Sequence, residues 1–250
     1  GSEMCIRDSA IYLGYDEFSA RAKAKNFNRE ELEEAIEYAH LRGVEIYVTF
    51  NILIADFEVK RAMKSVKMLY DTGVDALILQ DIGIAAKIRE EFPDFELHAS
   101  TQMAINNYYG AKFLKEMGFS RVVLARETPI FEIEKIKELD IDVETFIHGA
   151  LCVSYSGQCL MSSMIGGKSG NRGECAQACR RSYEIVDFDG KKLANRLYYL
   201  SPKDLNTLDD VAKIINAGAY SLKIEGRMKN PEYVYTVVSS YKKSLEGKLK

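Results

Sequence analysis

The sequence predicts an α/β fold, a (β/α)8 TIM-like barrel that lacks its first β/α unit and carries a cysteine-rich insertion and a late hairpin. Strands and helices alternate along most of the 250 residues. The strands are almost continuously apolar, which is typical of a parallel sheet covered on both faces. A glycine that can close a helix precedes four strands, at Gly43, Gly73, Gly118 and Gly218. An open doubly wound sheet fits the same pattern, but seven or eight units favour a barrel.

The chain begins with GSEMCIRDS, which has no periodicity and resembles a tag or junction. Residues 1–9 are therefore set aside, and Cys5 with them. The first predicted strand, Ala10–Gly14, arrives without a preceding helix, so we expect the first β/α unit to be missing. Residues 10–250 are predicted to form a single barrel domain, a size that is routine for this fold.

Five helix–strand units follow. In the first, Leu32, Ile36 and Ala39 have helical spacing, and the next segment is rich in β-branched and aromatic residues. Pro93 ends the third helix, because the residue before a proline avoids the helical region. Helices are expected at 31–43, 57–73, 82–92, 106–118 and 130–139, and strands at 44–50, 75–80, 95–100, 121–126 and 143–149.

The alternation breaks after Arg181. The stretch YEIVDFDGKKLANRLYYLS predicts a hairpin with Asp189 and Gly190 in its turn. A helix at 208–218 and a strand at 219–226 then complete the pattern. Pro231 opens a closing helix, a favoured place for proline.

Composition describes an ordinary globular protein, with 47% hydrophobic and 28% charged residues. No apolar run approaches the roughly 18 residues of a membrane span, so we expect a soluble, cytoplasmic protein. The net charge of −3 argues against non-specific nucleic-acid binding by the whole surface. Residues 168–196 reverse this balance, because they hold seven Lys/Arg against four acids. A solvated loop face accounts for such an excess as well as a binding surface does.

Four of the five cysteines cluster between residues 144 and 181, in the pattern C-x6-C-x15-C-x3-C. Thiolates are soft anionic ligands, and the glycines between them allow the turns that would gather them. The spacing favours a four-cysteine [4Fe–4S] cluster over zinc, whose ligands usually pair two to four residues apart. A disulfide framework does not suit a chain of this length without a secretory signal. The predicted cluster and metal ligands are Cys152, Cys159, Cys175 and Cys179.

Polar residues at the predicted strand ends are candidates for chemistry, because active sites of such barrels gather at the carboxyl ends of the strands. Lys223, Glu225 and Arg227 alternate along one strand and so share a face suited to an anionic substrate. A structural layer of ion pairs inside the barrel explains them equally well. The candidate catalytic residues are His98, Gln102, His148, Lys223, Glu225 and Arg227.

Motifs for other activities are absent from the sequence. Lys168 and Ser169 match the end of a nucleotide-binding P-loop, but the required first glycine is Ser162. The sequence holds no HExxH zinc-protease motif and no G-x-S-x-G nucleophile elbow.

Several segments together resemble the collagenase-like peptidase family, peptidase family U32. They are FIHGALCVSYSGQC, GNRGECAQACR, HASTQ, LARE, LSPKDL and LKIEGR, and the resemblance covers nearly the whole chain from Ala10 onward. It implies the barrel. It also implies an iron–sulfur cluster on cysteines arranged like these.

The resemblance implies two activities. Some members of the family are implicated in oxygen-independent or prephenate-dependent hydroxylation of RNA bases, and the family name implies a peptidase. We expect hydroxylation of a base in RNA, in tRNA rather than ribosomal RNA, with prephenate as a co-substrate. A collagenase-like peptidase with a structural metal site, and a non-catalytic subunit that works with a homologous partner, are the alternatives. The expected phosphate-binding residues are Lys168, Arg172, Arg180 and Arg181.

Overall fold

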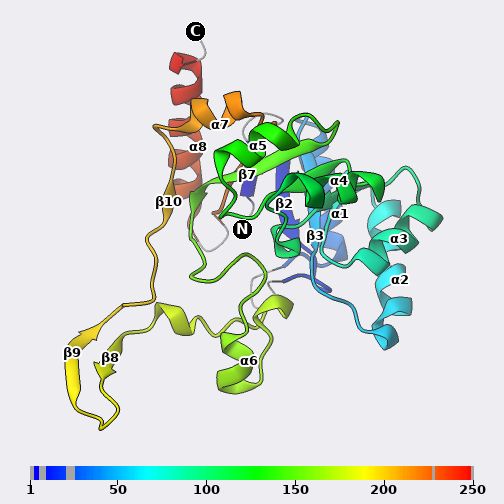
Figure 1. Ribbon diagram of the computed structural model, residues 1–250. Helices are drawn as coiled ribbons and strands as arrows, with labels where there is room; N and C mark the ends of the chain where they lie inside the picture. The colour runs from blue at the N-terminus through cyan, green and yellow to red at the C-terminus, as the bar shows by residue number, and fades with distance from the viewer. Residues whose placement is uncertain (1–2, 6–9, 21–25, 227–228, 249–250) are drawn as a thin grey trace.

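The computed structural model describes residues 3–5, 10–20, 26–226 and 229–248. Its centre is a curled sheet in which neighbouring strands run parallel from β2 to β7, and β11 pairs parallel to β7 (Figure 1). The predicted parallel α/β fold is confirmed. The parallel strands are β2 Ala10–Gly14, β3 Glu45–Phe50, β4 Ala76–Leu79, β5 Glu96–Ala99, β6 Arg121–Val123, β7 Asp142–Gly149 and β11 Ser221–Ile224.

The place between β11 and β2 is taken by a short strand that the sequence analysis did not predict. β1, Glu3–Cys5, pairs antiparallel with both neighbours. The segment regarded as a tag or junction therefore contributes a strand, and the first β/α unit of a complete barrel has no parallel counterpart among the described residues. A curled, mainly parallel sheet is established here, and a full (β/α)8 barrel is not.

Helices cover the sheet, one between most pairs of consecutive parallel strands (Figure 1). The four glycines before strands all have positive φ, between 65° and 121°, so each helix closes in the left-handed conformation that the sequence predicted. The first helix also begins with a capping box between Asn28 and Glu31. The helices are α1 Arg29–His40, α2 Val59–Asp71, α3 Ile82–Glu91, α4 Tyr108–Glu116, α5 Ile130–Ile136, α7 Val211–Ala217 and α8 Pro231–Lys248.

The core lies between the sheet and these helices, where Leu32, Leu77, Ile88, Leu97 and Leu114 are fully buried. Inside the curl the sheet also buries charge. Arg121 and Glu144 are almost inaccessible, and an ion pair of 3.7 Å joins them. Buried charges require partners of this kind, because an isolated charge away from water is costly.

The cysteine segment after β7, residues 150–181, and the hairpin lie at one end of the molecule, apart from the helices that cover the sheet (Figure 1). Their elements are α6 Met161–Gly166 and the antiparallel pair β8 Tyr183–Val186 and β9 Lys192–Leu197. The turn of the hairpin contains Gly190 at φ 81°, as the sequence predicted. β10, Leu205–Asn206, then returns to pair antiparallel with β7. No helix of the described residues is long and apolar enough to cross a membrane.

Candidate functional site

A cavity of about 730 Å³ separates the carboxyl end of the sheet from the cysteine segment. Residues of the seven parallel strands, or of the loops that follow them, line its sheet side, and the cysteine segment lines the other. All four predicted ligand cysteines contribute to it, together with Gln102, Lys223 and Glu225. The structure therefore brings the thiols and three of the six candidate catalytic residues to one space.

The floor of this cavity contains a buried lysine. Lys223 is 3% exposed, and its Nζ lies 2.5 Å from Oε1 of Glu144 and 3.8 Å from the centre of the Tyr12 ring. Ser221 donates a hydrogen bond to the other oxygen of the same carboxylate. Burial alone would raise the pKa of Glu144, but Lys223 and Arg121 outweigh it and lower that pKa to about 2. Glu144 is thus a carboxylate that holds Lys223 in place.

One wall combines a second ion pair with an aromatic ring. Arg126 donates from Nη2 to Oε2 of Glu225 at 2.6 Å, and its guanidinium lies 4.0 Å from the centre of the Phe146 ring. Both interactions restrict the guanidinium, because a planar cation stacks on a ring while it pairs with a carboxylate. Arg126 follows β6, and Glu225 follows β11, so the pair joins two strand ends.

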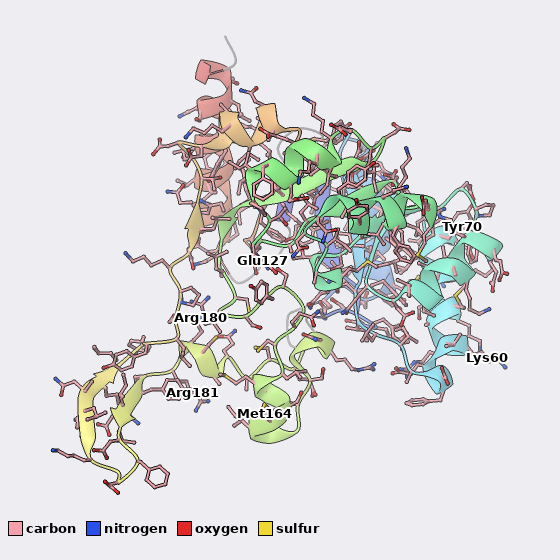
Figure 2. The ribbon with its side chains drawn as sticks, in the orientation of Figure 1. Lys60, Tyr70, Glu127, Met164, Arg180 and Arg181 are labelled. Carbon is pink, nitrogen blue, oxygen red and sulfur yellow. The ribbon has the colours of Figure 1, made fainter. Side chains whose placement is uncertain are left out.

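The cysteine segment is attached to the sheet by Glu127, whose carboxylate accepts two hydrogen bonds from Ser156, one from N–H and one from the hydroxyl, both at 2.9 Å. Figure 2 labels Glu127 on the sheet side of this contact. Gly157, the next residue, has φ 72°, and a Cβ there would lie 2.3 Å from the carbonyl oxygen of Gln102. Only glycine allows the segment to approach the sheet so closely.

Two arginines add further attachments. Arg172 donates to both oxygens of Glu58 at 2.7 and 3.1 Å, and to the carbonyl of Leu53. Arg180 donates to Ser201, Pro202 and Leu151, three acceptors on separate parts of the chain. The arginine between Cys179 and the hairpin therefore ties the cysteine segment together at the edge of the cavity (Figure 2).

The thiols influence one another across the cavity. Burial raises the pKa of Cys179, Arg180 opposes this, and the other three cysteines raise that pKa further. Mutual repulsion of thiolates has this sign, and a cation among them would reverse it. The backbone N–H of Gln177, a residue with φ 53°, lies 3.4 Å from Sγ of Cys175 and donates to it.

The donor set fits an iron–sulfur cluster. Four thiolates are the usual ligands of such a cluster, and N–H donors to their sulfurs tune its potential. Among the described residues, no three His, Cys, Asp or Glu side chains lie close enough together to hold a single metal ion. Convergence of the four sulfurs on one cluster stays a prediction, and zinc stays its alternative.

Two of the candidate catalytic residues, His98 and His148, are not among the residues that line this cavity. His98 is 0% exposed inside the curled sheet, where Nε2 lies 2.8 Å from Glu96 and the ring packs edge-on against Tyr47. His148 packs instead against Tyr233 and Tyr241 of α8. His98 has its imidazole directed along the interior towards Glu96, and the ring of His148 lies on the helix side of β7.

Two of the expected phosphate-binding residues also have other roles. The guanidinium groups of Arg172 and Arg180 donate hydrogen bonds within the protein, as described above, and their contact with RNA phosphates stays a prediction. Lys168 and Arg181 are exposed and stay candidates. Arg227 lies outside the described residues.

Several residues that shape the site were not among the candidates from the sequence. Tyr12 lies in an apolar strand, and Glu144 and Phe146 lie in a strand that mixes polar and apolar residues, so their direction into the interior is not visible from composition. The alternation of side chains along a strand was the available signal, because Glu144 and Phe146 are two residues apart. Arg126 and Glu127 are strand-end residues by sequence, but their partners Glu225 and Ser156 are distant in the chain.

Comparisons with known proteins identify the family of this chain. The profile of peptidase family U32 matches residues 7–250. The tRNA hydroxylation protein P1 of Bacillus subtilis is 41% identical over 245 residues, which cover 95% of this chain and 58% of that protein. The 23S rRNA 5-hydroxycytidine C2501 synthase of Escherichia coli is 42% identical over 239 residues, 95% of this chain and 36% of the relative. A collagenase of Porphyromonas gingivalis is 35% identical over 253 residues, 95% of this chain and 60% of the relative.

The chain thus spans between about a third and three fifths of the length of these relatives. A solved U32 peptidase superposes with a TM-score of 0.48 at 16% identity, over 57% of this chain and 62% of that one, which is too weak to carry an argument. The family assignment rests on the profile and on the sequence identities. The chain belongs to peptidase family U32.

Proposed function

We propose that this chain is the cluster-binding part of an enzyme that hydroxylates a base in RNA, with tRNA as the preferred substrate. The observation that carries the proposal is the shared cavity, where four cysteines face a buried lysine and an arginine–glutamate pair. Relatives named for tRNA and rRNA hydroxylation match over 95% of the chain. A redox reaction on a base needs a cofactor that amino acid side chains do not provide.

Cys152, Cys159, Cys175 and Cys179 would hold the [4Fe–4S] cluster, which would supply redox or Lewis-acid chemistry at the wall opposite the sheet. Lys223 would bind a carboxylate of a small co-substrate, for which we propose prephenate. Glu144 holds the Lys223 ammonium group at the floor of the cavity, so the position of that group is fixed before the co-substrate binds.

Glu225 and Gln102 complete the proposed substrate contacts. Arg126 orients the Glu225 carboxylate, which is the group in this wall that can exchange a proton with a bound base. Gln102 adds an amide that can both donate to and accept from a base edge. The hydrogen bonds between Ser156 and Glu127 attach the cysteine segment to the sheet, which fixes the position of one side of the cavity relative to the other.

The test is mass spectrometry of tRNA and ribosomal RNA from cells that lack the gene, complemented with the full-length protein or with its Cys175→Ala variant. We expect a hydroxylated nucleoside to disappear from one RNA class, to return with the wild type, and to stay absent with the variant. Lys223→Met should fail in the same way while leaving the iron content intact, since it alters the floor and not the thiols.

The relative named collagenase makes peptidase activity the second candidate. Purified protein that cleaves gelatin, together with unchanged hydroxynucleosides in the deletion strain, would replace the hydroxylase proposal with that one. Activity that appears only when a homologous protein is added would favour a partner subunit.

A further inference from the structure

A basic and aromatic arm leaves the cavity edge directly after the last cysteine. We define the arm as residues 181–200, which comprise the β8–β9 hairpin and the chain that follows it. It points away from the sheet and its helices (Figure 1), and Arg181 lies at its base (Figure 2). The side chains of Phe188, Tyr198 and Tyr199 are 105%, 65% and 42% exposed. Three accessible rings on one short segment need a physical reason, because large aromatic side chains are usually covered.

The arm lacks a core of its own. Its apolar side chains are also exposed, and the hairpin has only two strands. An isolated two-stranded hairpin is marginally stable in water. The structure therefore maintains an extended surface that gains little from burial, which is expected of a segment that binds something else. The exposed aliphatic residues are Ile185, Val186, Leu193, Leu197 and Leu200.

The charges of the arm favour an anionic partner. Lys192 is paired with Glu184 at 3.2 Å, and the Asp187 carboxylate accepts hydrogen bonds from the backbone of the turn at residues 189 and 191. Glu184 thus offsets the charge of Lys192, whereas Asp187 keeps its charge, and the arm holds four cations against three acids. Arg181, Lys191 and Arg196 are exposed, on a protein whose net charge is −3.

Tyr198 and Tyr199 are close in sequence to residues at the edge of the cavity. Tyr199 donates from its hydroxyl to the carbonyl of Asn195 at 2.6 Å, which fixes the orientation of that ring. Ser201 and Pro202, two and three residues further on, accept hydrogen bonds from Arg180, which lines the cavity. A polymer that contacts Tyr198 and Tyr199 is therefore next to the lip of the site.

We propose that the arm binds unpaired RNA beside the target base: bases stack on Tyr198, Tyr199 and Phe188, and phosphates meet Arg181, Lys191 and Arg196. Aromatic platforms interleaved with cations are how proteins bind single strands without reading sequence. This inference rests on the proposed function for the identity of the polymer. It adds a binding surface outside the cavity and separate from the thiols.

The experiment measures binding of a fluorescein-labelled oligouridine by fluorescence anisotropy. Tyr198→Leu keeps an apolar side chain of similar reach but removes the ring, so we expect the Kd to rise roughly tenfold, the equivalent of about 1.4 kcal/mol. Tyr198→Phe keeps the ring and should bind like the wild type. Arg196→Gln should reduce the salt slope of log affinity by about 0.7, the contribution of one phosphate contact to a single strand.

Matched controls come from helices outside the arm. Tyr235→Leu changes a ring on α8 that is also exposed, and Lys60→Gln removes an exposed cation on α2. Both should bind oligouridine as the wild type does, and a fully paired duplex should bind more weakly than the single strand. Unchanged thermal unfolding in each variant would show that the sheet is intact.

Equal affinity of the Tyr198→Leu variant and the wild type would overturn the proposal. If that variant instead changes the mass of the protein in solution, the arm is an apolar protein interface. The outcome is independent of the hydroxylase test, because oligouridine binding requires no reaction. An arm that binds RNA in a protein that modifies none would leave this inference standing and remove the proposed function.

Discussion

The interior of the sheet and the cysteine segment hold their polar and reactive side chains in different ways. Inside the sheet, Lys223, Glu144 and Arg121 are buried and held by one another. In the cysteine segment, Cys152 and Cys175 are exposed, and the backbone is held by a few polar attachments such as Ser156 to Glu127. The sheet thus positions its groups by packing, and the segment positions its thiols by tethers. From this difference we expect the cysteine segment to depend on the proposed cluster, and the sheet to be independent of it.

The largest effect should separate the two regions completely. Cys159→Ser removes one of the four thiolates, so we expect the anaerobically purified protein to lose its iron, its brown colour and its activity. The free energy of unfolding should stay within about 0.5 kcal/mol of that of the metal-free wild type, because the Cys159 side chain lies outside the core. Iron analysis and urea denaturation of the same preparations test both statements. Joint loss of iron and of the fold would mean that the sheet depends on the segment.

The next effect concerns the sheet alone. Glu144→Ala leaves Lys223 and Arg121 without the carboxylate that they share, so the free energy of unfolding should fall by about 3–5 kcal/mol. Glu34→Ala on the exposed face of α1 is the control and should change it by less than about 0.5 kcal/mol. Urea denaturation measures both. A small loss in the first variant would show that the buried charges find other partners or water.

Acid should act on the sheet through the same carboxyl. The pKa of Glu144 is lowered from 4.5 to about 2 in the folded protein, because Lys223 and Arg121 outweigh the effect of burial. A depressed carboxyl pKa stabilises the folded state above the unfolded pKa, so this stability is present above pH 4.5 and is lost as the pH falls towards 2. Glu144→Gln should flatten the dependence of the urea midpoint on pH between about pH 5 and about pH 3. The same slope in variant and wild type would assign the acid sensitivity to other carboxyls.

The smallest effect should lie at the junction of the two regions. Gly157→Ala places a methyl group 2.3 Å from the Gln102 carbonyl at a positive φ, which should cost about 1–3 kcal/mol locally and lower the iron occupancy. Gly166→Ala is the matched control, since no atom lies within 4 Å of its Cβ position and its φ is not positive. Iron content per protein compares them. Equal occupancy in both variants would mean that the cysteine segment does not need its close approach to the sheet.

Local features of the fold were predictable because neighbouring residues determine them. The helix-closing glycines at positions 43, 73, 118 and 218 and the hairpin turn at Gly190 have the backbone conformations that their sequence context indicated. The apolar strands were recognisable for the same reason, since burial on both faces requires near-continuous apolar residues. The clustering of four cysteines also indicated which segment carries the site.

The sequence by itself determined the order of the parallel strands and the helices between them, the family and the four thiols, because these depend on residue type and short spacing. The tertiary structure decided which polar groups share the cavity. His98 lies in β5 and Ser100 directly follows that strand, yet only Ser100 reaches the cavity, because the depth of a side chain depends on where the strand ends within the sheet. From the sequence, Arg172 and Arg180 are candidates for contact with phosphates. In the folded chain, the Glu58 acceptor of Arg172 lies more than 100 residues away in sequence, and the acceptors of Arg180 lie about 20 to 30 residues away. Contacts across such separations depend on the packing of the whole chain, so they cannot be predicted from residue type and spacing.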